Sequence, residues 1–247
     1  MNATSAFPAE AGTAPAAASG RRILVWDVPV RVFHWLMVAS FAGAWITAES
    51  ERWRLLHVTL GYTMAGLVAF RLIWGLVGTK HARFADFVRG PRAVARYLGA
   101  LLRGRPEHHV GHNPAGALAI VAMLALAALL TFSGWATYNE VFGEALEDLH
   151  EGVANAMMAV VLVHVAGVVL ASWMHRENLV GSMVTGTKFG DPREGIRRAW
   201  TGVGALMLAA VTGFWALQWQ SAPAAGAAGG PPTALERAGH DRDHDDD

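Results

Sequence analysis

The sequence predicts an all-α integral membrane protein, in which a four-helix transmembrane bundle is followed by a fifth transmembrane helix. Of the 247 residues, 53% are hydrophobic and 16% are charged, whereas about a quarter of the residues of a soluble domain are charged. The apolar residues gather in five segments, each near the roughly 20 residues that cross a bilayer. These segments are approximately 30–47, 55–77, 115–138, 153–174 and 200–219.

Lys and Arg concentrate on one side of the membrane. They occupy the N-terminal flank, the loop after the second span and the loop after the fourth span. The loop after the third span carries only acidic charges, among them Glu140 and Glu147. The positive-inside rule therefore predicts a multi-pass protein of the bacterial inner membrane, with a cytoplasmic N-terminus and a periplasmic C-terminus.

The remaining segments are polar or interfacial. Residues 1–22 and 220–247 are rich in small residues, Pro or Asp, and we expect them to be disordered cytoplasmic and periplasmic tails. Residues 91–102 place apolar side chains at helical spacing with Arg between them. This pattern predicts a short amphipathic helix on the cytoplasmic surface, used for packing or membrane contact rather than as a binding site.

Four histidines lie within the spans, where ionisable residues are costly and mark functional sites. His34 and His164 fall in the cytoplasmic halves of their spans, and His57 and His150 fall in the outer halves. His150 and His164 are fourteen residues apart, which is close to four helical turns and about 21 Å along the axis, so both rings leave one face of the helix. One helix therefore offers an imidazole at each of two depths.

The other two histidines supply a partner at each depth, His57 for His150 and His34 for His164. Two imidazoles that face each other in a bundle are the axial ligands of a bis-His haem. The sequence has no Cys, so disulfides, thiolate metal sites and covalent haem attachment are excluded. We therefore predict two haem b groups whose iron ligands are His34, His57, His150 and His164. With both axial positions filled, such haems carry out one-electron transfer and not substrate chemistry.

Two arginines and two glycines are consistent with this interpretation. Arg71 lies fourteen residues after His57 and is predicted to bind an inner haem propionate, with Arg31 in the same role at the membrane edge. The alternative for Arg71 is that it extends to the cytoplasmic surface. Gly61 and Gly167, one turn from His57 and from His164, remove bulk beside the rings, although such glycines also mark ordinary helix packing.

The histidines also allow roles that involve no haem. A single His at a span end is often an interfacial residue, and a haem-free transporter or assembly protein could use the histidines as a proton relay. The spans contain no acidic residue away from their ends, which a relay normally includes. Zinc is disfavoured because His150-Glu151 does not continue as H-E-x-x-H.

Six motifs give the chain a resemblance to a known family. They are VWDVPVRVFHW (25–35), LLHVTLGY (55–62), FRLIWGLVG (70–78), GHNPAGAL (111–118), HEGVAN (150–155) and HRENLVGSMVTG (175–186). Together they resemble the prokaryotic cytochrome b-561 family, which is related to the cytochrome b subunits of nickel–iron hydrogenases. The resemblance implies a four-helix diheme domain over 23–190 that exchanges electrons with the quinone pool, and the four histidines match the family's ligand positions. Residues 191–219, the loop and fifth helix, lie outside that pattern.

The resemblance leaves several functions open. We expect transmembrane electron transfer between ubiquinone or quinol and a redox partner, in an electron-transfer protein or a quinone-linked oxidoreductase. The alternatives are the cytochrome b anchor of a nickel–iron hydrogenase and a superoxide:quinone oxidoreductase. A periplasmic cytochrome c and membrane lipid are the other expected partners, and no nucleic acid is expected. The HHVGH cluster over 108–112 is expected to lie mostly at the surface, with a quinone-site or metal role as the lesser hypothesis.

Overall fold

The computed structural model describes residues 21–104, 109–141 and 143–221. Its long helices, in chain order, are α1 (Val28–Thr47), α2 (Arg54–Val77), α5 (Pro114–Tyr138), α6 (Ala145–His175) and α8 (Thr201–Gln220). All five are long and apolar enough to cross a membrane, which confirms the five predicted spans. The short elements are β1 (Arg21–Leu24), η1 (Glu51–Trp53), α3 (Phe84–Phe87), α4 (Pro91–Leu102), α7 (Leu179–Thr185), β2 (Thr187–Gly190) and η2 (Pro192–Glu194).

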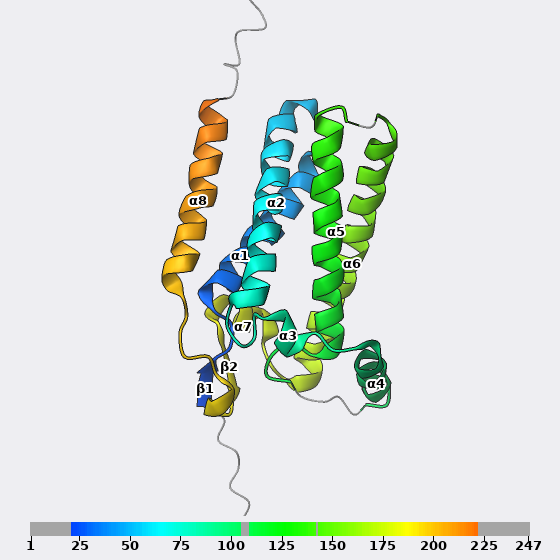
Figure 1. Cartoon of the computed structure of the whole chain (residues 1–247). Coiled ribbons are helices and arrows are strands. Elements are labelled where there is room, and N and C mark those ends of the chain that lie inside the picture. The colour runs from blue at the N-terminus through cyan, green and yellow to red at the C-terminus, as the bar shows by residue number, and fades with distance from the viewer. Residues whose placement is uncertain (1–20, 105–108, 142, 222–247) are drawn as a thin grey trace, which may run out of the picture.

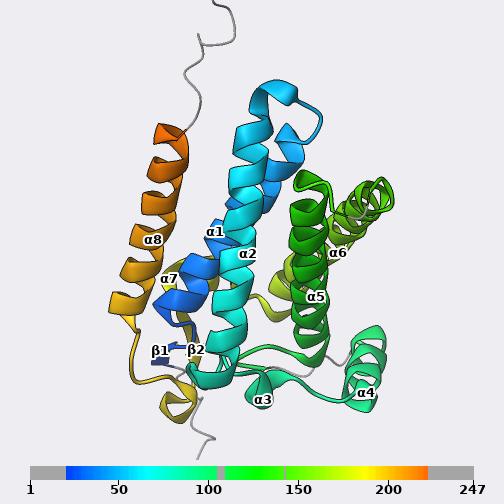
Figure 2. The same ribbon diagram turned by 45° about the horizontal axis from the view of Figure 1, so that its top comes forward.

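Four of the helices form a bundle. α1 packs against α2, α2 against α5, and α5 against α6, while α8 lies outside the bundle against α1 (Figure 1). Turning the molecule shows α1 and α6 on the same side, behind α2 and α5 (Figure 2). α1 and α6 therefore lie on one side of the bundle, and α2 and α5 on the other.

The two ends of the bundle differ in structure and charge. β1, β2, α3, α4 and α7 gather at one end (Figure 1), which also carries the loop arginines and is called the basic end below. The end where α1 meets α2 and where α5 meets α6 is called the opposite end. Described residues at the start of the chain lie at the basic end, and α8 finishes at the opposite end.

A buried carboxylate fixes the start of α1. Asp27 is 1% exposed, and its Oδ1 accepts a hydrogen bond of 2.8 Å from the Val30 amide, as an N-cap residue does. Its Oδ2 accepts hydrogen bonds from Trp74 Nε1 at 3.1 Å and from Thr79 Oγ1 at 2.6 Å. Asp27 therefore ties the first turn of α1 to the last turn of α2.

A small antiparallel sheet closes the basic end. β1 pairs with β2 so that Arg21 lies opposite Gly190 and Leu24 opposite Thr187. Gly186 precedes β2 with a φ of 82°, and a Cβ there would lie 2.8 Å from the carbonyl oxygen of Trp26, so only glycine fits this turn without strain. Strand β1 thus takes in Arg21 and Arg22, the last two residues of the segment that we expected to be a tail.

Helix α6 begins earlier than its apolar span. It starts at Ala145, eight residues before the hydrophobic segment that the sequence predicted to begin at residue 153. The polar residues of this first part, Glu147 and Asp148, are exposed, so the helix extends beyond the apolar layer. His150 therefore lies within a helix, with more than one turn of α6 before it.

α8 is bound to the bundle by close contacts. Gly204 lies so near α1 that a Cβ there would be 2.5 Å from Val28 Cγ1. Trp215 Nε1 donates a hydrogen bond of 2.9 Å to Thr63 Oγ1 of α2. The fifth helix is therefore packed specifically against the first two.

Candidate functional site: two levels of histidine

His57 of α2 and His150 of α6 face each other near the opposite end of the bundle. Their ring centroids are 6.2 Å apart and their planes are inclined by 76°. A metal–imidazole bond is about 2 Å long, so two such bonds in line, with roughly 1 Å from each nitrogen to its ring centre, separate the centroids by about 6 Å. The separation of the two rings thus fits one metal ion bound between them.

Both rings are held by their other nitrogen. His57 Nδ1 lies 2.9 Å from the carbonyl oxygen of Ala44 on α1. His150 Nδ1 lies 3.1 Å from the carbonyl oxygen of Leu130 and 3.2 Å from Ser133 Oγ, both on α5. A backbone carbonyl only accepts, so each Nδ1 carries the proton and each Nε2 keeps a lone pair for a metal. Metal-ligating histidines are commonly oriented in this way.

A glycine on α5 makes room for His150. A Cβ on Gly134 would lie 2.7 Å from His150 Cε1 and 3.1 Å from its Nδ1. Gly61 and Gly167 differ, because a Cβ at either position meets nothing within 4 Å. These two glycines therefore adjoin open space and not a packed helix.

His34 of α1 and His164 of α6 lie at the level nearer the basic end. Both are half-buried. His34 Nδ1 is enclosed, and it has no hydrogen-bond partner among the described residues. The structure thus places the two residues of the predicted inner pair at one level, but hydrogen bonds orient them less than they orient the outer pair.

Arg71 is buried beside this inner level. Arg71 is 3% exposed. Its Cζ lies 4.8 Å from the ring centroid of Phe84 and 5.9 Å from that of Phe87. The alternative in which Arg71 extends to the surface is therefore wrong. Its Nη1 is enclosed without a hydrogen-bond partner in the described part of the chain. A buried guanidinium in this state favours an anionic ligand, and a haem propionate has the required charge.

Arg31 lies in the first turns of α1 and points toward α7. Its Nη2 donates a hydrogen bond to the carbonyl oxygen of Val184. Its Nε is enclosed and has no partner within the described ranges. Arg31 thus helps to fix α7, and its Nε can donate to an anionic group.

The ring of His112 packs against aromatic side chains at the basic end, which the sequence did not indicate. Its ring centroid lies 4.6 Å from those of both Trp26 and Phe87, and its Nδ1 is enclosed. Burial, followed by the nearby groups Arg71, His81 and Lys188, lowers the pKa of His112 to about 3. His112 is therefore half-buried and not at the surface as expected, while His108 of the same cluster lies outside the described residues.

Apolar side chains separate the two levels. Phe41, Met64, Val68, Ala127, Leu130, Val153 and Met157 form one buried cluster drawn from all four bundle helices. Val153 and Met157 stand between His150 and His164 on α6, and Met64 and Val68 stand between His57 and Arg71 on α2. This layer excludes water from the centre of the bundle. Within the described residues, no group of three or more His, Asp or Glu side chains could hold a metal ion.

The chain is similar to a known protein family and to several named proteins. A family model described as prokaryotic cytochrome b561 matches residues 25–186. A "Probable Ni/Fe-hydrogenase B-type cytochrome subunit" of Rhizobium leguminosarum bv. viciae is 25% identical, over 70% of this chain and 91% of the relative. The protein of that name from Azotobacter vinelandii is 27% identical, over 69% and 90%. The "Probable Ni/Fe-hydrogenase 1 B-type cytochrome subunit" of Escherichia coli K12 is 25% identical, over 47% and 60%. No solved structure matches the chain.

Proposed function

Since the chain belongs to the prokaryotic cytochrome b561 family, and is therefore a haem b-binding electron-transfer protein of the membrane, we propose that it carries two b haems. One is held by His57 and His150, and the other by His34 and His164. The observation that carries this proposal is the 6.2 Å separation of the His57 and His150 rings, with each Nδ1 bonded to a helix carbonyl. Bound haem supplies one-electron redox chemistry at each level.

The residues of the chain hold and isolate these sites. The carbonyl oxygens of Ala44 and Leu130 orient the outer imidazoles. Arg71 and Arg31 offer enclosed guanidinium nitrogens to the propionates of the inner group. The apolar layer around Met64 and Met157 keeps water from the space between the levels. The result is a path for electrons across the hydrocarbon part of the membrane.

The proposed orientation follows the charges. Lys80, Arg83, Arg89 and other loop cations lie at the basic end, whereas Glu140, Glu144 and Glu147 belong to the turn at the opposite end. The positive-inside rule assigns the basic end to the cytoplasm, in the bacterial inner membrane. The inner pair then faces the cytoplasm, and the outer pair faces the periplasm.

Ubiquinone or quinol is the proposed exchange partner in the membrane. A lipid-soluble two-electron carrier suits a site whose own groups transfer one electron at a time, because two haems accept its electrons in turn. A redox protein outside the membrane, a hydrogenase or a periplasmic cytochrome c, completes the circuit. Membrane lipid is the remaining partner.

The names of the relatives favour hydrogenase as that soluble partner. They are called Ni/Fe-hydrogenase B-type cytochrome subunits, so the second candidate function is the membrane anchor that takes electrons from such an enzyme. The haem-free proton relay receives no support from these comparisons. Superoxide is the less favoured candidate for the electron donor, because Arg54 near the opposite end lies 3.8 Å from Glu51, which reduces the attraction of this end for an anion.

Haem content tests the proposed sites. The purified protein is expected to contain two b haems per polypeptide by absorption spectroscopy of the reduced protein. His57→Ala and His164→Ala should each retain one, while His81→Gln, a control outside the pairs, should retain both. A ratio of one in the unchanged protein, or two haems in both alanine variants, would overturn the assignment.

Reduction kinetics test the partners. The oxidised protein is mixed separately with ubiquinol, with nickel–iron hydrogenase plus hydrogen, and with superoxide, and reduction of the haem band is followed. Rapid reduction by ubiquinol supports the quinone-linked function, and rapid reduction that requires hydrogenase supports the anchor function. Reduction by superoxide alone would contradict both.

A further inference from the structure

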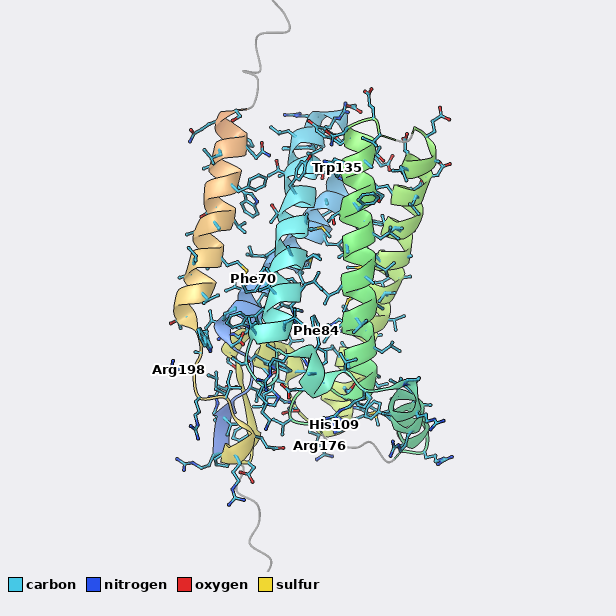
Figure 3. The ribbon with its side chains drawn as sticks, in the orientation of Figure 1. Phe70, Phe84, His109, Trp135, Arg176 and Arg198 are labelled. Carbon is cyan, nitrogen blue, oxygen red and sulfur yellow. The ribbon has the colours of Figure 1, made fainter. Side chains whose placement is uncertain are left out.

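An apolar groove lies between α2 and α5 on the outside of the bundle. Its larger part has a volume of about 560 Å³, and its walls include Leu72, Phe84, Val88, Val121, Leu124 and Ala128. A second part of about 270 Å³ shares Leu72 and Ala128 and continues toward the opposite end. Figure 3 shows Phe84 near the lower end of this interval and Trp135, which lines the second part, near the upper end.

The groove opens sideways, where the lipid of the membrane lies. Leu72 is 47% exposed, Val88 44% and Val121 40%, so its rims are not covered by other parts of the chain that the structure describes. From Val121 to Ala128 the α5 backbone rises about 10 Å, within one leaflet of about 15 Å. The larger part of the groove therefore has the depth and the apolar lining for a lipid acyl chain.

Arginines stand at the lower end of the groove. Val88 lines the groove, and the next residue is the exposed Arg89, whose Nη2 donates to the carbonyl oxygen of Asp86. Arg92 and Arg96 follow on α4, four residues apart and so on one face of the helix. α4 lies beside the lower end of α5, outside the bundle (Figure 1). A row of exposed guanidinium groups at this depth suits lipid phosphate.

The interior of the groove is closed to polar groups. The ring of Phe84 forms its wall, and Arg71 lies behind that ring, 4.8 Å from its centroid. A quinone headgroup in the groove would therefore meet Phe84 and not the buried guanidinium. In the described part of α3, α4 and the segment between them, the cations beside the groove are arginines. These arginines are exposed at the membrane surface.

From this juxtaposition we infer that the groove between α2 and α5 is a binding site for an anionic phospholipid. One acyl chain lies between Leu72 and Ala128, and the phosphate group lies against Arg89 and Arg92. The inference requires only that the protein spans a membrane, and it is independent of the haem and quinone assignments.

Lipid binding to the whole protein tests the site. The delipidated haem-containing protein in a mild detergent is titrated with dioleoyl phosphatidylglycerol or dioleoyl phosphatidylcholine, and bound lipid is counted by native mass spectrometry. We expect one phosphatidylglycerol to bind at least tenfold more tightly than phosphatidylcholine. Arg89→Gln with Arg92→Gln should weaken phosphatidylglycerol binding roughly 30-fold, since each arginine near an anionic headgroup contributes about 1 kcal/mol.

Two further variants separate the groove from general surface charge. Ala125→Phe, which fills the groove from α5, should reduce phosphatidylglycerol binding at least tenfold while the haem spectrum stays unchanged. Arg197→Gln with Arg198→Gln removes two exposed charges at the same end and should leave binding unchanged. High salt should weaken phosphatidylglycerol binding to the unchanged protein, because it screens exposed charges.

Several outcomes would overturn the inference. These are equal affinity for the two lipids, equal losses in the Arg89/Arg92 and Arg197/Arg198 variants, or unchanged binding to Ala125→Phe. Displacement of phosphatidylglycerol by ubiquinone would also overturn it, because the groove would then serve the quinone. If the purified protein contained no haem but bound phosphatidylglycerol as described, only the proposed haem function would be contradicted.

Discussion

The His150 ring occupies the space that a side chain at Gly134 would fill. A Cβ on Gly134 would lie 2.7 Å from His150 Cε1, a distance that real Cβ atoms do not tolerate. We therefore expect Gly134→Ala to displace the ring and lower occupancy of the outer haem to less than half, with the inner haem retained. Haem per polypeptide measures the effect.

The control for this substitution is Gly213→Ala. A Cβ on Gly213 of α8 meets nothing within 4 Å, so the same added methyl group should leave both haems in place. If Gly134→Ala also retains both, His150 is not held in the position described, and the outer site is wrong.

Removal of the buried Arg71 charge is expected to affect one haem. Its guanidinium lies at the inner level with an enclosed Nη1, and a nearby positive charge favours the reduced, more negative form of a haem. Arg71→Gln should lower one of two midpoint potentials by about 60 mV, equivalent to about 1.4 kcal/mol for one electron. Spectroelectrochemical titration resolves the two steps.

The exposed Arg193 supplies the comparison for Arg71. Arg193→Gln removes a charge of the same sign at the basic end, but water screens it, and both potentials should stay within about 10 mV of those of the unchanged protein. An equal shift of both potentials by Arg71→Gln would contradict its placement at one level.

The low pKa of His112 predicts a dependence of stability on pH. Because burial and neighbouring cations lower its pKa from 6.5 to about 3 in the folded chain, the unfolded chain binds one more proton at this residue between these values. The contribution of His112 to stability is therefore full above pH 6.5 and declines as the pH falls toward 3. Thermal unfolding in detergent, measured from pH 8 to about pH 4, should show this decline.

His112→Gln removes the titrating group and keeps a polar side chain. The variant should be less stable at about pH 8 through lost packing on Trp26 and Phe87, but its stability should fall less steeply toward acid. If the stability of the two proteins fell equally as the pH was lowered, the decline would not come from His112, and the prediction would be wrong.

Asp27 holds three donors, and we expect its loss to weaken the basic end. Asp27→Ala leaves the Val30 amide, Trp74 Nε1 and Thr79 Oγ1 without their acceptor. The expected cost is about 2–4 kcal/mol, from a lost N-cap and buried donors left unpaired. Thermal unfolding at about pH 7 measures it, and Asp86→Ala, which removes an exposed carboxylate, should cost less than about 1 kcal/mol.

The sequence predicted the features that depend on the helical repeat. The five spans follow from hydropathy alone, and the fourteen-residue interval between His150 and His164 placed both rings on one face. Hydropathy marks the apolar layer and not the helix ends, so it missed the polar first turns of α6. Glu147 and Asp148 suit the exposed first turn of a helix, where acidic side chains are favourable, but they do not belong to an apolar span.

Features made by distant residues were not predicted. Gly134 is one of 27 glycines, and only the fold shows that His150, from the next helix, fills the space beside it. His112 sits in a polar sequence that resembles a surface loop, and its burial depends on Trp26 and Phe87 from two other segments. The contacts of Asp27 with Trp74 and Thr79 likewise have no local pattern in the sequence.

The pairing of β1 with β2 constrains biosynthesis. Arg21 lies opposite Gly190, so the first strand has no partner until the ribosome has made the four bundle helices and the segment up to residue 190. The four bundle helices can thus still separate while the chain is being made. Strand pairing then fastens the two ends of the four-helix unit together, and it does so without waiting for α8.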